Sequence, residues 1–246
     1  MWGRKYWNEY LGKFGNIAYI VEWLSARMPD EIISVSAHTK KQLISQLKVK
    51  QKIYVVPNGI DLNYIEKVKP AKELSDLIFA GRLLSHKNVD MLLKVTADLK
   101  KKIPDIKTII VGNGPDEKHL KKLAKQLGIE KNVSFINFLE DHSYLYSLMK
   151  SSKAFIFPSD REGFGIVALE ANACNIPVIT VDAKNNAAKY LIQDGKNGYV
   201  APLNREGLFY KTWLILQNKK KNNFNDILKP FDWEYIKDTL IGAYNI

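Results

Sequence analysis

Beyond about residue 75, short apolar runs alternate with segments whose apolar residues recur at the spacing of a helix. The runs in chain order are LIFA (77–80), TIIVG (108–112), VSFI (133–136), AFIF (154–157), PVITV (177–181) and GYV (198–200). Short strands that are apolar on both faces and joined by amphipathic helices are typical of βαβ units in a parallel sheet. The sequence therefore predicts an α/β fold with a Rossmann-like doubly wound parallel sheet.

The segments between these runs predict the helices of the fold. Residues 89–99 carry apolar side chains at positions 89, 92, 93, 95 and 99, which is a helical period. Further helices are expected around 120–127, with Gly128 as a suitable stop, around 145–149, over 165–174 and around 186–192.

Both ends of the chain differ from this pattern. EIISVS (31–36), a helix at about 38–47 and IYVVPNGID (53–61) form a β–α–β piece with too few strands for a sheet of its own. Residues 217–229 are polar and lysine-rich and predict a linker, and residues 231–246 predict a final helix. We expect three parts: residues 1–65 as the remnant of an N-terminal domain with its hinge, residues 66–229 as the main domain, and residues 230–246 as a helix that returns to the first part.

Charge and cysteine content narrow the classes of function. The chain has 246 residues, a net charge of +11 and one cysteine, Cys174. A single cysteine excludes a disulfide framework within the chain and fits a reducing compartment, so we expect a cytoplasmic protein, with the inner face of the membrane as the alternative location. The positive charge suits nucleic acid, an anionic membrane surface or a phosphorylated small molecule. No nucleic-acid-binding module accompanies the lysines, so no nucleic-acid partner is predicted.

The most informative residues fall in the loops that follow the predicted strands, where open parallel sheets bind their ligands. These loops carry two cations, Arg82 and Lys87, and two acids, Glu162 and Glu170, which flank the glycines of EGFGIVALE (162–170). The glycine-rich stretch opens a helix, whose unpaired N–H groups and positive dipole end attract an anion. We therefore predict a site for a diphosphate without a metal. Glu170 would accept the hydroxyls of a ribose, and Glu162 would face a sugar.

Each of these residues also has a plainer interpretation. Taken alone, Arg82 and Lys87 are more often solvated surface charges. Glu170 would then be a residue on a helix surface, and Glu162 an acid that stabilises the first turn of a helix. The four histidines show no metal-ligand spacing, and Cys174 is interpreted as a small buried hydrophobe.

EGFGIVALE (162–170) resembles the E-x7-E motif of retaining, nucleotide-sugar-dependent glycosyltransferases of family 4, which have the GT-B fold. Further stretches similar to that family occur in the expected order: VVPNGID (55–61), FAGRLLSHKNVDMLL (79–93), IIVGNGP (109–115), FIFPS (155–159), PVIT (177–180) and DGKNGYV (194–200). The resemblance covers roughly residues 20–246. It implies a hexosyltransferase that takes a UDP-sugar or GDP-sugar, needs no metal or other cofactor, and modifies an unidentified glycan or lipid acceptor.

The resemblance also implies roles for single residues. Glu162 would be the catalytic residue, in contact with hydroxyls of the donor sugar. The implied donor-binding residues are Gly81, Arg82, Lys87, Gly112, Leu139, Gly163, Phe164, Gly165, Ile166 and Glu170. Arg82 and Lys87 would bind the diphosphate, and the stretch between the two acids would present its backbone. Leu139 and the Gly112 loop would border the base.

The sequence departs from the family pattern at several places. Asn175 stands where relatives often have glycine, and asparagine also tolerates a left-handed helix cap. Relatives commonly carry a Gly-Gly and a glutamate after the next strand, whereas AKNNAAKYLI (183–192) has no acid, which leaves the donor sugar open. Most of the acceptor-binding first domain has no counterpart in the chain, so we expect the chain to be incomplete for activity alone.

Two alternatives to an enzyme are open. One is a non-catalytic nucleotide-sugar-binding or partner subunit of a split glycosyltransferase, with a separate N-terminal half as its partner. The other is a basic protein in peripheral contact with a membrane through the aromatic and basic segment 2–27. Without the missing domain, we expect residues 1–65 and 231–246 to expose apolar surface, including Trp2, Trp7, Trp23 and Trp233.

Overall fold

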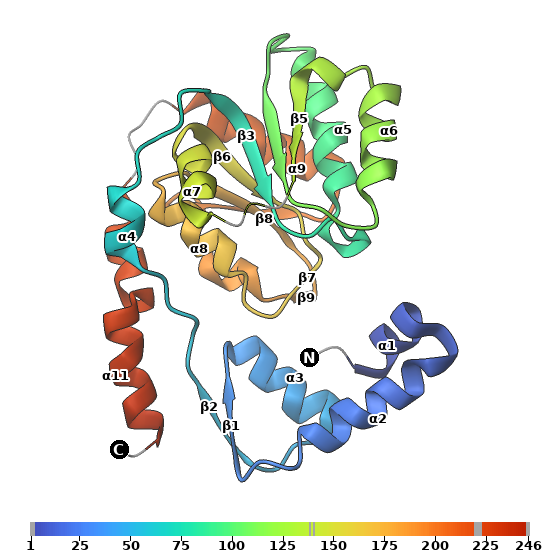
Figure 1. Ribbon diagram of the computed structural model, residues 1–246, viewed down its shortest axis with the longest axis vertical. Helices are drawn as coiled ribbons and strands as arrows, with labels where there is room; N and C mark the ends of the chain where they lie inside the picture. Colours follow the sequence, from blue (N-terminus) through green and yellow to red (C-terminus); the bar gives the residue numbers. More distant parts are fainter. Residues whose placement is uncertain (1–2, 138, 140, 219–222, 245–246) are drawn as a thin grey trace. The chain divides into compact units, whose positions relative to one another are not determined.

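The computed structural model describes residues 3–137, 139, 141–218 and 223–244 (Figure 1). The chain forms two compact units, one of residues 59–233 and one of residues up to 58 together with those from 234 onward. The larger unit thus also contains residues 59–65 and 230–233, which the sequence assigned to the flanking parts. The interpretation of the smaller unit as the remnant of an N-terminal domain stays a prediction.

The larger unit is built on a six-stranded parallel sheet. Its strands are β3 (Ser75–Ala80), β4 (Thr108–Val111), β5 (Val133–Ile136), β6 (Ser152–Phe157), β8 (Val178–Asp182) and β10 (Gly198–Pro202). They lie in the order β10-β8-β6-β3-β4-β5, and every neighbouring pair is parallel. In the centre, Leu77 of β3 lies opposite Thr108 of β4 and Ala154 of β6. This strand order is that of a Rossmann-type doubly wound sheet, so the predicted fold class is confirmed.

Helices cover both faces of this sheet (Figure 1). The α-helices are α4 (Leu62–Lys67), α5 (Val89–Lys100), α6 (Glu117–Gln126), α7 (His142–Lys150), α8 (Ile166–Ala173), α9 (Arg205–Gln217) and α10 (Asn225–Leu228). The shorter elements are η2 (Ser85–Lys87), η3 (Glu130–Asn132), η4 (Ala187–Leu191) and η5 (Lys229–Phe231), with the two-residue strands β7 (Arg161–Glu162) and β9 (Asn185–Asn186). Helix α5 packs against α6 and α9, whereas α7 and α8 pack against each other and against β6. The central strands are accordingly buried on both sides, with Ile78 and Phe155 fully inaccessible.

The structure corrects three local predictions in this unit. Helix α9 was not predicted, because its apolar residues at 208–210 and 213–216 lie on all sides of the helix, although the buried ones follow a helical spacing. The helix expected around 186–192 is a short 3-10 helix, η4, preceded by β9. The predicted linker 217–229 lies partly outside the described residues, but its described part contains α10. Phe224 and Leu228 are buried there, so this part packs on the domain rather than connecting domains.

The smaller unit contains a two-stranded parallel sheet and helices. Its elements are α1 (Gly3–Leu11), η1 (Gly12–Phe14), α2 (Gly15–Ser25), β1 (Glu31–Ser34), α3 (Ala37–Leu47), β2 (Lys52–Val55) and all but the first residue of α11 (Trp233–Tyr244). Strands β1 and β2 pair in parallel as a two-stranded sheet, so the expectation that these strands are too few for a sheet of their own is wrong. Val56, which follows β2, packs with Ile236 and Ala243 of α11. The final helix is thus part of the same compact unit as the N-terminal segment.

Part of the smaller unit's surface is apolar. Ile17, Val21 and Leu24 lie three to four residues apart on α2 and are 60%, 57% and 50% exposed. Trp23 and Trp233 are exposed, as predicted, whereas Trp7 is half-buried and donates its indole N–H to Glu22 (2.9 Å). Trp2 lies outside the described residues. Within the described ranges, no helix is long and apolar enough to cross a lipid bilayer.

Candidate functional site

The carboxyl ends of β3 and β6 are the point where the winding of the sheet reverses. The two strands are neighbours, but β4 is added beyond β3 on one side and β8 beyond β6 on the other. In sheets of this kind, ligands bind just outside the strands at such a switch point. Gly81 and Arg82 follow β3, and residues 158–165 follow β6. The topology thus brings the two loops singled out in the sequence to the same place.

Lys87 and Glu162 form an ion pair across the two loops. The Nζ atom of Lys87 lies 2.5 Å from Oε1 of Glu162, and the two side chains are only 15% and 13% exposed. The same Nζ lies 5.2 Å from the centroid of the Phe157 ring at the end of β6. The interpretation of Lys87 as a solvated surface charge is therefore wrong. A partly buried ion pair of this kind holds both side chains in place.

The backbone of residue 86 fastens the β6 loop to the β3 loop. The carbonyl oxygen of His86 accepts hydrogen bonds from the Asp160 N–H (2.9 Å) and from the Ser159 hydroxyl (3.3 Å). The Asn88 amide donates to the Pro158 carbonyl (3.0 Å). Burial and the neighbouring Lys87 lower the pKa of the His86 imidazole. The loop that carries Glu162 is therefore held in place by the segment that carries Lys87.

Glycines allow the loops at this edge to approach each other closely. Gly112 has φ +133°, and a Cβ atom on it would collide with the carbonyl oxygen of Gly81. The Gly112 N–H also donates to the Ile136 carbonyl at the end of β5 (2.8 Å). Only glycine fits there without moving the β3 loop. The structure gives Gly81 and Gly112 a packing role at the site.

Helix α8 starts directly beside the ion pair. Gly165 precedes it with φ +93°, a left-handed conformation, and has no side chain to cap the first-turn N–H groups. The ring of Phe164 is buried and lies 6.2 Å from that of Phe231, so Phe164 contributes its backbone rather than its ring to the loop surface. Gly163 is exposed and Ile166 is 39% exposed. The amide end of α8 can therefore receive an anion.

Glu170 lies one turn further along α8 in a partly buried environment. Its Oε1 accepts a hydrogen bond from the Tyr146 hydroxyl (2.8 Å). Burial raises the pKa of the Glu170 carboxyl, and Tyr146 and His142 oppose this shift. Burial and the adjacent Glu170 in turn raise the pKa of Tyr146. Glu170 is thus not a freely solvated residue of a helix surface. A desolvated carboxylate with one fixed donor is suited to accept hydroxyl groups.

The remaining predicted residues are placed less tightly. Arg82 is exposed, and the described part of the chain offers its guanidinium no hydrogen-bonding or ionic partner. Leu139 is half-buried in the segment after β5, between two residues that the structure does not describe. Among the described residues, no three His, Cys, Asp or Glu side chains cluster in a way that would hold a metal ion. Cys174 is buried as predicted, and burial raises the pKa of its thiol to about 12.

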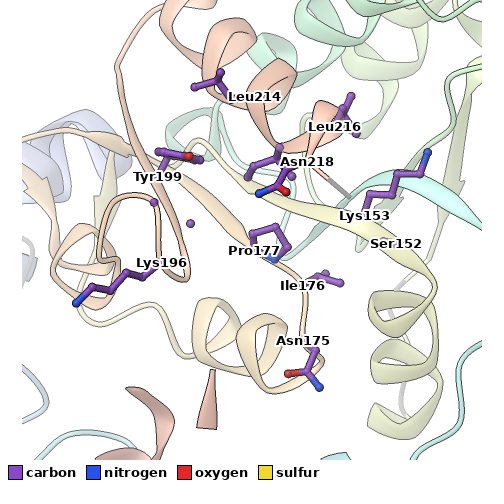
Figure 2. Close-up of a pocket in the computed structure, with 13 residues that line it drawn as sticks. Ser152, Lys153, Asn175, Ile176, Pro177, Lys196, Tyr199, Leu214, Leu216 and Asn218 are labelled. Atoms are coloured by element: carbon purple, nitrogen blue, oxygen red, sulfur yellow. The ribbon is translucent and has the colours of Figure 1, made fainter. Parts of the chain in front are cut away.

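A different hollow lies at the opposite, amino-terminal edge of the sheet (Figure 2). It has a volume of about 400 Å³ and is lined by the starts of β6 and β10, by residues 175–177 just before β8 and by the end of α9. Pro177, Tyr199 and Leu214 provide apolar lining, and Lys153 and Lys196 provide positive charge. No residue predicted for the site lines this pocket.

Sequence reasoning missed the partners that hold the predicted residues. Ser159 and Asn88 fall inside stretches that were singled out, and small polar residues at strand ends are a usable signal for such anchors. Tyr146 carried no such signal, because it belongs to α7 and reaches Glu170 only across the packed pair of helices. The direct pairing of Lys87 with Glu162 was not predicted either.

A doubly wound parallel sheet with charged residues in the loops at its switch point is the architecture of many nucleotide-binding α/β domains. Residues 62–224 match the family described as glycosyl transferases group 1, and residues 1–64 match glycosyltransferase family 4. The chain therefore belongs to the group 1 glycosyltransferases.

Its curated relatives are longer than this chain. It is 33% identical over 203 residues to an uncharacterised glycosyltransferase of Haemophilus influenzae, covering 80% of this chain and 55% of that protein. It is 28% identical over 188 residues to a GDP-mannose-dependent alpha-(1-6)-phosphatidylinositol monomannoside mannosyltransferase of Mycolicibacterium smegmatis, covering 70% and 48%. The chain thus spans about half the length of these relatives.

Solved structures of GT-B glycosyltransferases share the fold. Sucrose-phosphate synthase of Thermosynechococcus elongatus superposes with a TM-score of 0.79 at 21% identity, over 92% of this chain and 60% of that one. The pneumococcal O-GlcNAc transferase GtfA, in complex with UDP and GlcNAc, gives 0.75 at 21% identity over 92% and 46%. A GtfA/B complex gives 0.73 at 19% identity over 92% and 47%.

Proposed function

We propose that this chain supplies the donor site of a retaining glycosyltransferase that transfers a sugar from a nucleotide-diphosphate sugar. Family membership supports the reaction class. The pneumococcal neighbour that holds UDP and GlcNAc supports a nucleotide sugar as the donor. Since the chain spans about half of its relatives, activity would require the part of the enzyme that binds the acceptor, a glycan or lipid.

In this proposal the diphosphate binds at the start of α8. Arg82 and Lys87 neutralise its charge, and the first-turn N–H groups of α8 donate to its oxygens, so that no metal is required. The exposed guanidinium of Arg82, which has no hydrogen-bonding or ionic partner among the described residues, is available for such a contact. Lys87 would exchange part of its interaction with Glu162 for the phosphate, since an ammonium group has three donors.

The two acids flank the diphosphate. Glu170 accepts hydroxyls of the ribose, and the Tyr146 hydroxyl holds its carboxylate in position. Glu162 contacts hydroxyls of the donor sugar, while the Gly112 loop and Leu139 border the base. For retention, the acceptor hydroxyl attacks the anomeric carbon from the face of the leaving group. The bond to the diphosphate oxygen breaks, and that oxygen takes the acceptor's proton.

One observation carries the proposal: the Lys87–Glu162 ion pair lies beside a glycine-capped helix that also presents a partly buried glutamate. Solvated surface charges do not explain why this positive group and these two acids are withdrawn from water in one place. Groups with restricted solvation and fixed partners cluster at functional sites.

Calorimetry with UDP and with GDP tests the proposal. The chain should bind at least one of them. Arg82→Ala should weaken binding of the nucleoside diphosphate and hardly change that of the nucleoside, whereas Glu170→Ala should weaken both. Lys196→Ala, at the opposite edge of the sheet, is the matched control and should bind like the parent chain. A folded chain that binds neither nucleotide would contradict the proposal.

A second candidate is a nucleotide-sugar-binding or partner subunit of a split glycosyltransferase. The exposed apolar stripe of Ile17, Val21 and Leu24 on α2 favours it, since such surfaces are commonly covered by another polypeptide. The two candidates differ in whether this chain's site performs the transfer. A separately produced N-terminal half can be co-purified with the chain and assayed for sugar transfer. Transfer that is lost with Glu162→Ala supports the enzyme, whereas transfer that persists supports the non-catalytic subunit.

A further inference from the structure

The backbone that carries Glu162 is held by a segment for which the proposed function has no role. Residues 161–162 form β7, which pairs in parallel with β9, so that Glu162 lies opposite Asn186 and Arg161 opposite Asn185. This pairing comes from AKNNAAKYLI (183–192), the stretch in which relatives commonly have glycines and an acid. The position of the Glu162 carboxylate therefore depends on how residues 185–186 are fixed.

Asn186 is fixed by its own side chain, which is fully buried. Its Nδ2 donates to the Thr180 hydroxyl (3.0 Å) and to the Val181 carbonyl (2.8 Å), and its Oδ1 accepts from the Ala188 N–H (3.0 Å). Thr180 then donates to the Phe157 carbonyl at the end of β6 (3.1 Å). Only a neutral carboxamide supplies two donors and one acceptor in this way. One side chain thus joins the ends of β6 and β8 to the start of η4.

The same side chain controls the start of α8. Asn186 sets the first residues of η4, and Ala188 of η4 is packed against the helix-capping glycine. A Cβ atom built on Gly165 would lie 2.5 Å from the Cβ of Ala188. The backbone at Ala188 therefore defines how closely the amide end of α8 approaches this part of the loop. A shift of η4 would move the amide end of α8 and the pairing partner of Glu162 together.

We propose that Asn186 is a positioning residue for the sugar-binding part of the donor site. It fixes Glu162 and the amide end of α8 relative to each other, and acts through them rather than by touching the sugar. This inference rests on the proposed function, in which Glu162 faces the donor sugar. Because Glu170 lies a turn further into α8 and is held by Tyr146, the nucleoside contact depends less on Asn186.

Asn197 provides a matched control. It is also fully buried, its Nδ2 donates to Asn172 Oδ1 (2.9 Å) and to the Leu191 carbonyl (2.9 Å), and its Oδ1 accepts from the Gln193 N–H (2.7 Å). Asn197→Asp removes the same number of donors from the same kind of environment. Asn197 holds the last residue of η4, Leu191, and the carboxyl-terminal turn of α8 at Asn172, which are the ends of both elements away from Asn186 and from the β6 loop. A purely structural loss should therefore be similar in the two variants.

The experiment compares nucleoside diphosphates with their sugar-bearing forms by calorimetry. The probes are UDP against UDP-glucose, UDP-galactose and UDP-N-acetylglucosamine, and GDP against GDP-mannose. The readout is the affinity ratio between the tightest-binding sugar nucleotide and its diphosphate. We expect Asn186→Asp to reduce this ratio about tenfold or more, since small misplacements of positioning groups carry penalties of this order. Binding of the diphosphate alone should weaken less than binding of the sugar nucleotide, because Arg82 and Lys87 still contact the diphosphate when the start of α8 moves. Asn197→Asp should leave the ratio unchanged.

Thr180→Val is the second variant, because it removes Asn186's hydroxyl partner with little change in volume. It should lower the ratio in the same direction even if Asn186→Asp does not fold. An unchanged ratio in a folded Asn186→Asp or Thr180→Val variant overturns the inference, as does an equal loss in Asn197→Asp. A parent chain that binds the diphosphate and all sugar nucleotides equally also overturns it, since no sugar contact is then positioned. A parent chain that binds no nucleotide instead contradicts the proposed function itself.

Discussion

Positive side chains lie at both ends of the parallel strands of the six-stranded sheet, but they differ in burial and pairing. The side with the carboxyl ends of the strands is called the carboxyl edge, and the opposite side is called the amino edge. At the carboxyl edge, Lys87 is mostly buried and paired with an acid 75 residues away in the chain. At the amino edge, Lys196 is exposed beside an open pocket, and Lys153 pairs with Asp76 while remaining 64% exposed. A charge that is buried away from water needs a fixed partner of opposite charge, which here comes from a distant segment of the chain. A solvated lysine needs no such partner. The comparison indicates that buried, paired charges identify the functional site better than the volume of a pocket does.

The largest expected effect concerns the packing of the carboxyl edge. Gly112→Ala should lower the free energy of unfolding by roughly 3 kcal/mol or more, because its Cβ would meet the Gly81 carbonyl and its φ of +133° is unfavourable for alanine. Gly128→Ala is the control, since Gly128 has φ +66° but open space around the added atom. It should cost only about 1–2 kcal/mol. Urea unfolding measures the free energy of unfolding of both variants. Equal losses of stability would show that the Gly112 and Gly81 loops are not tightly packed.

The next effect separates the two edges by their charges. Arg82→Ala and Lys87→Ala should each weaken binding of UDP or GDP roughly 10- to 100-fold, as expected for one charge-assisted contact. Lys153→Ala and Lys196→Ala at the amino edge should bind like the parent chain. Calorimetry gives the four affinities. The comparison of the edges fails if the amino-edge variants lose affinity and the carboxyl-edge variants do not.

Lys87→Ala also leaves Glu162 without its partner, which destabilises the folded chain. The double variant Lys87→Ala/Glu162→Gln removes the unpaired charge and should recover part of that stability without recovering nucleotide affinity. Thermal unfolding and calorimetry on the same samples distinguish the two effects. Recovery of affinity in the double variant would mean that Lys87 acts only through Glu162.

The smallest effect is a dependence of stability on pH. Because burial raises the pKa of Glu170, the folded chain holds this proton to higher pH than the unfolded chain does, and wild-type stability falls as pH rises through the raised pKa. Glu170→Gln keeps an acceptor for Tyr146 and cannot ionise. It should therefore be more stable than wild type at pH 8, with a difference that shrinks towards pH 4.

Tyr146→Phe sharpens this test. The Tyr146 hydrogen bond opposes the raised pKa of Glu170, so its removal should raise that pKa further and move the loss of stability to higher pH. Urea unfolding across pH 4–8 measures the trend. A Glu170→Gln variant whose stability follows that of wild type at every pH would show that Glu170 is solvated.

The pattern of residues predicted the fold because each buried strand is a continuous apolar run. VSFI at 133–136 matches β5 from Val133 to Ile136, since nothing competes with the strand assignment there. The pattern did not predict helix α9, because the apolar residues of this helix do not lie on one face. The burial of Leu208 and Ile215 depends on strands from elsewhere in the chain. Asn175 adopts the left-handed conformation expected of it, with φ +60°.

Sheet topology predicted which loops of the site lie together, but not the contacts between their side chains. Parallel strands place their carboxyl ends together, which was enough to bring Arg82, Lys87 and Glu162 to one edge. The pairing of Lys87 with Glu162 and the hydrogen bonds of Asn186 depend on side-chain geometry across long separations in the chain. No local spacing encodes such contacts, so the groups that hold the site in place appeared only in the structure.

The most direct test of the central claim is amide hydrogen exchange of the full chain with and without saturating UDP or GDP. The account predicts that a nucleotide slows exchange in the loop containing Arg82 and Lys87 and in the segment from Gly163 to Glu170. Exchange around Lys196, Tyr199 and Leu214 at the amino edge should not change. Protection confined to the amino-edge pocket, with none at the start of α8, would contradict the account.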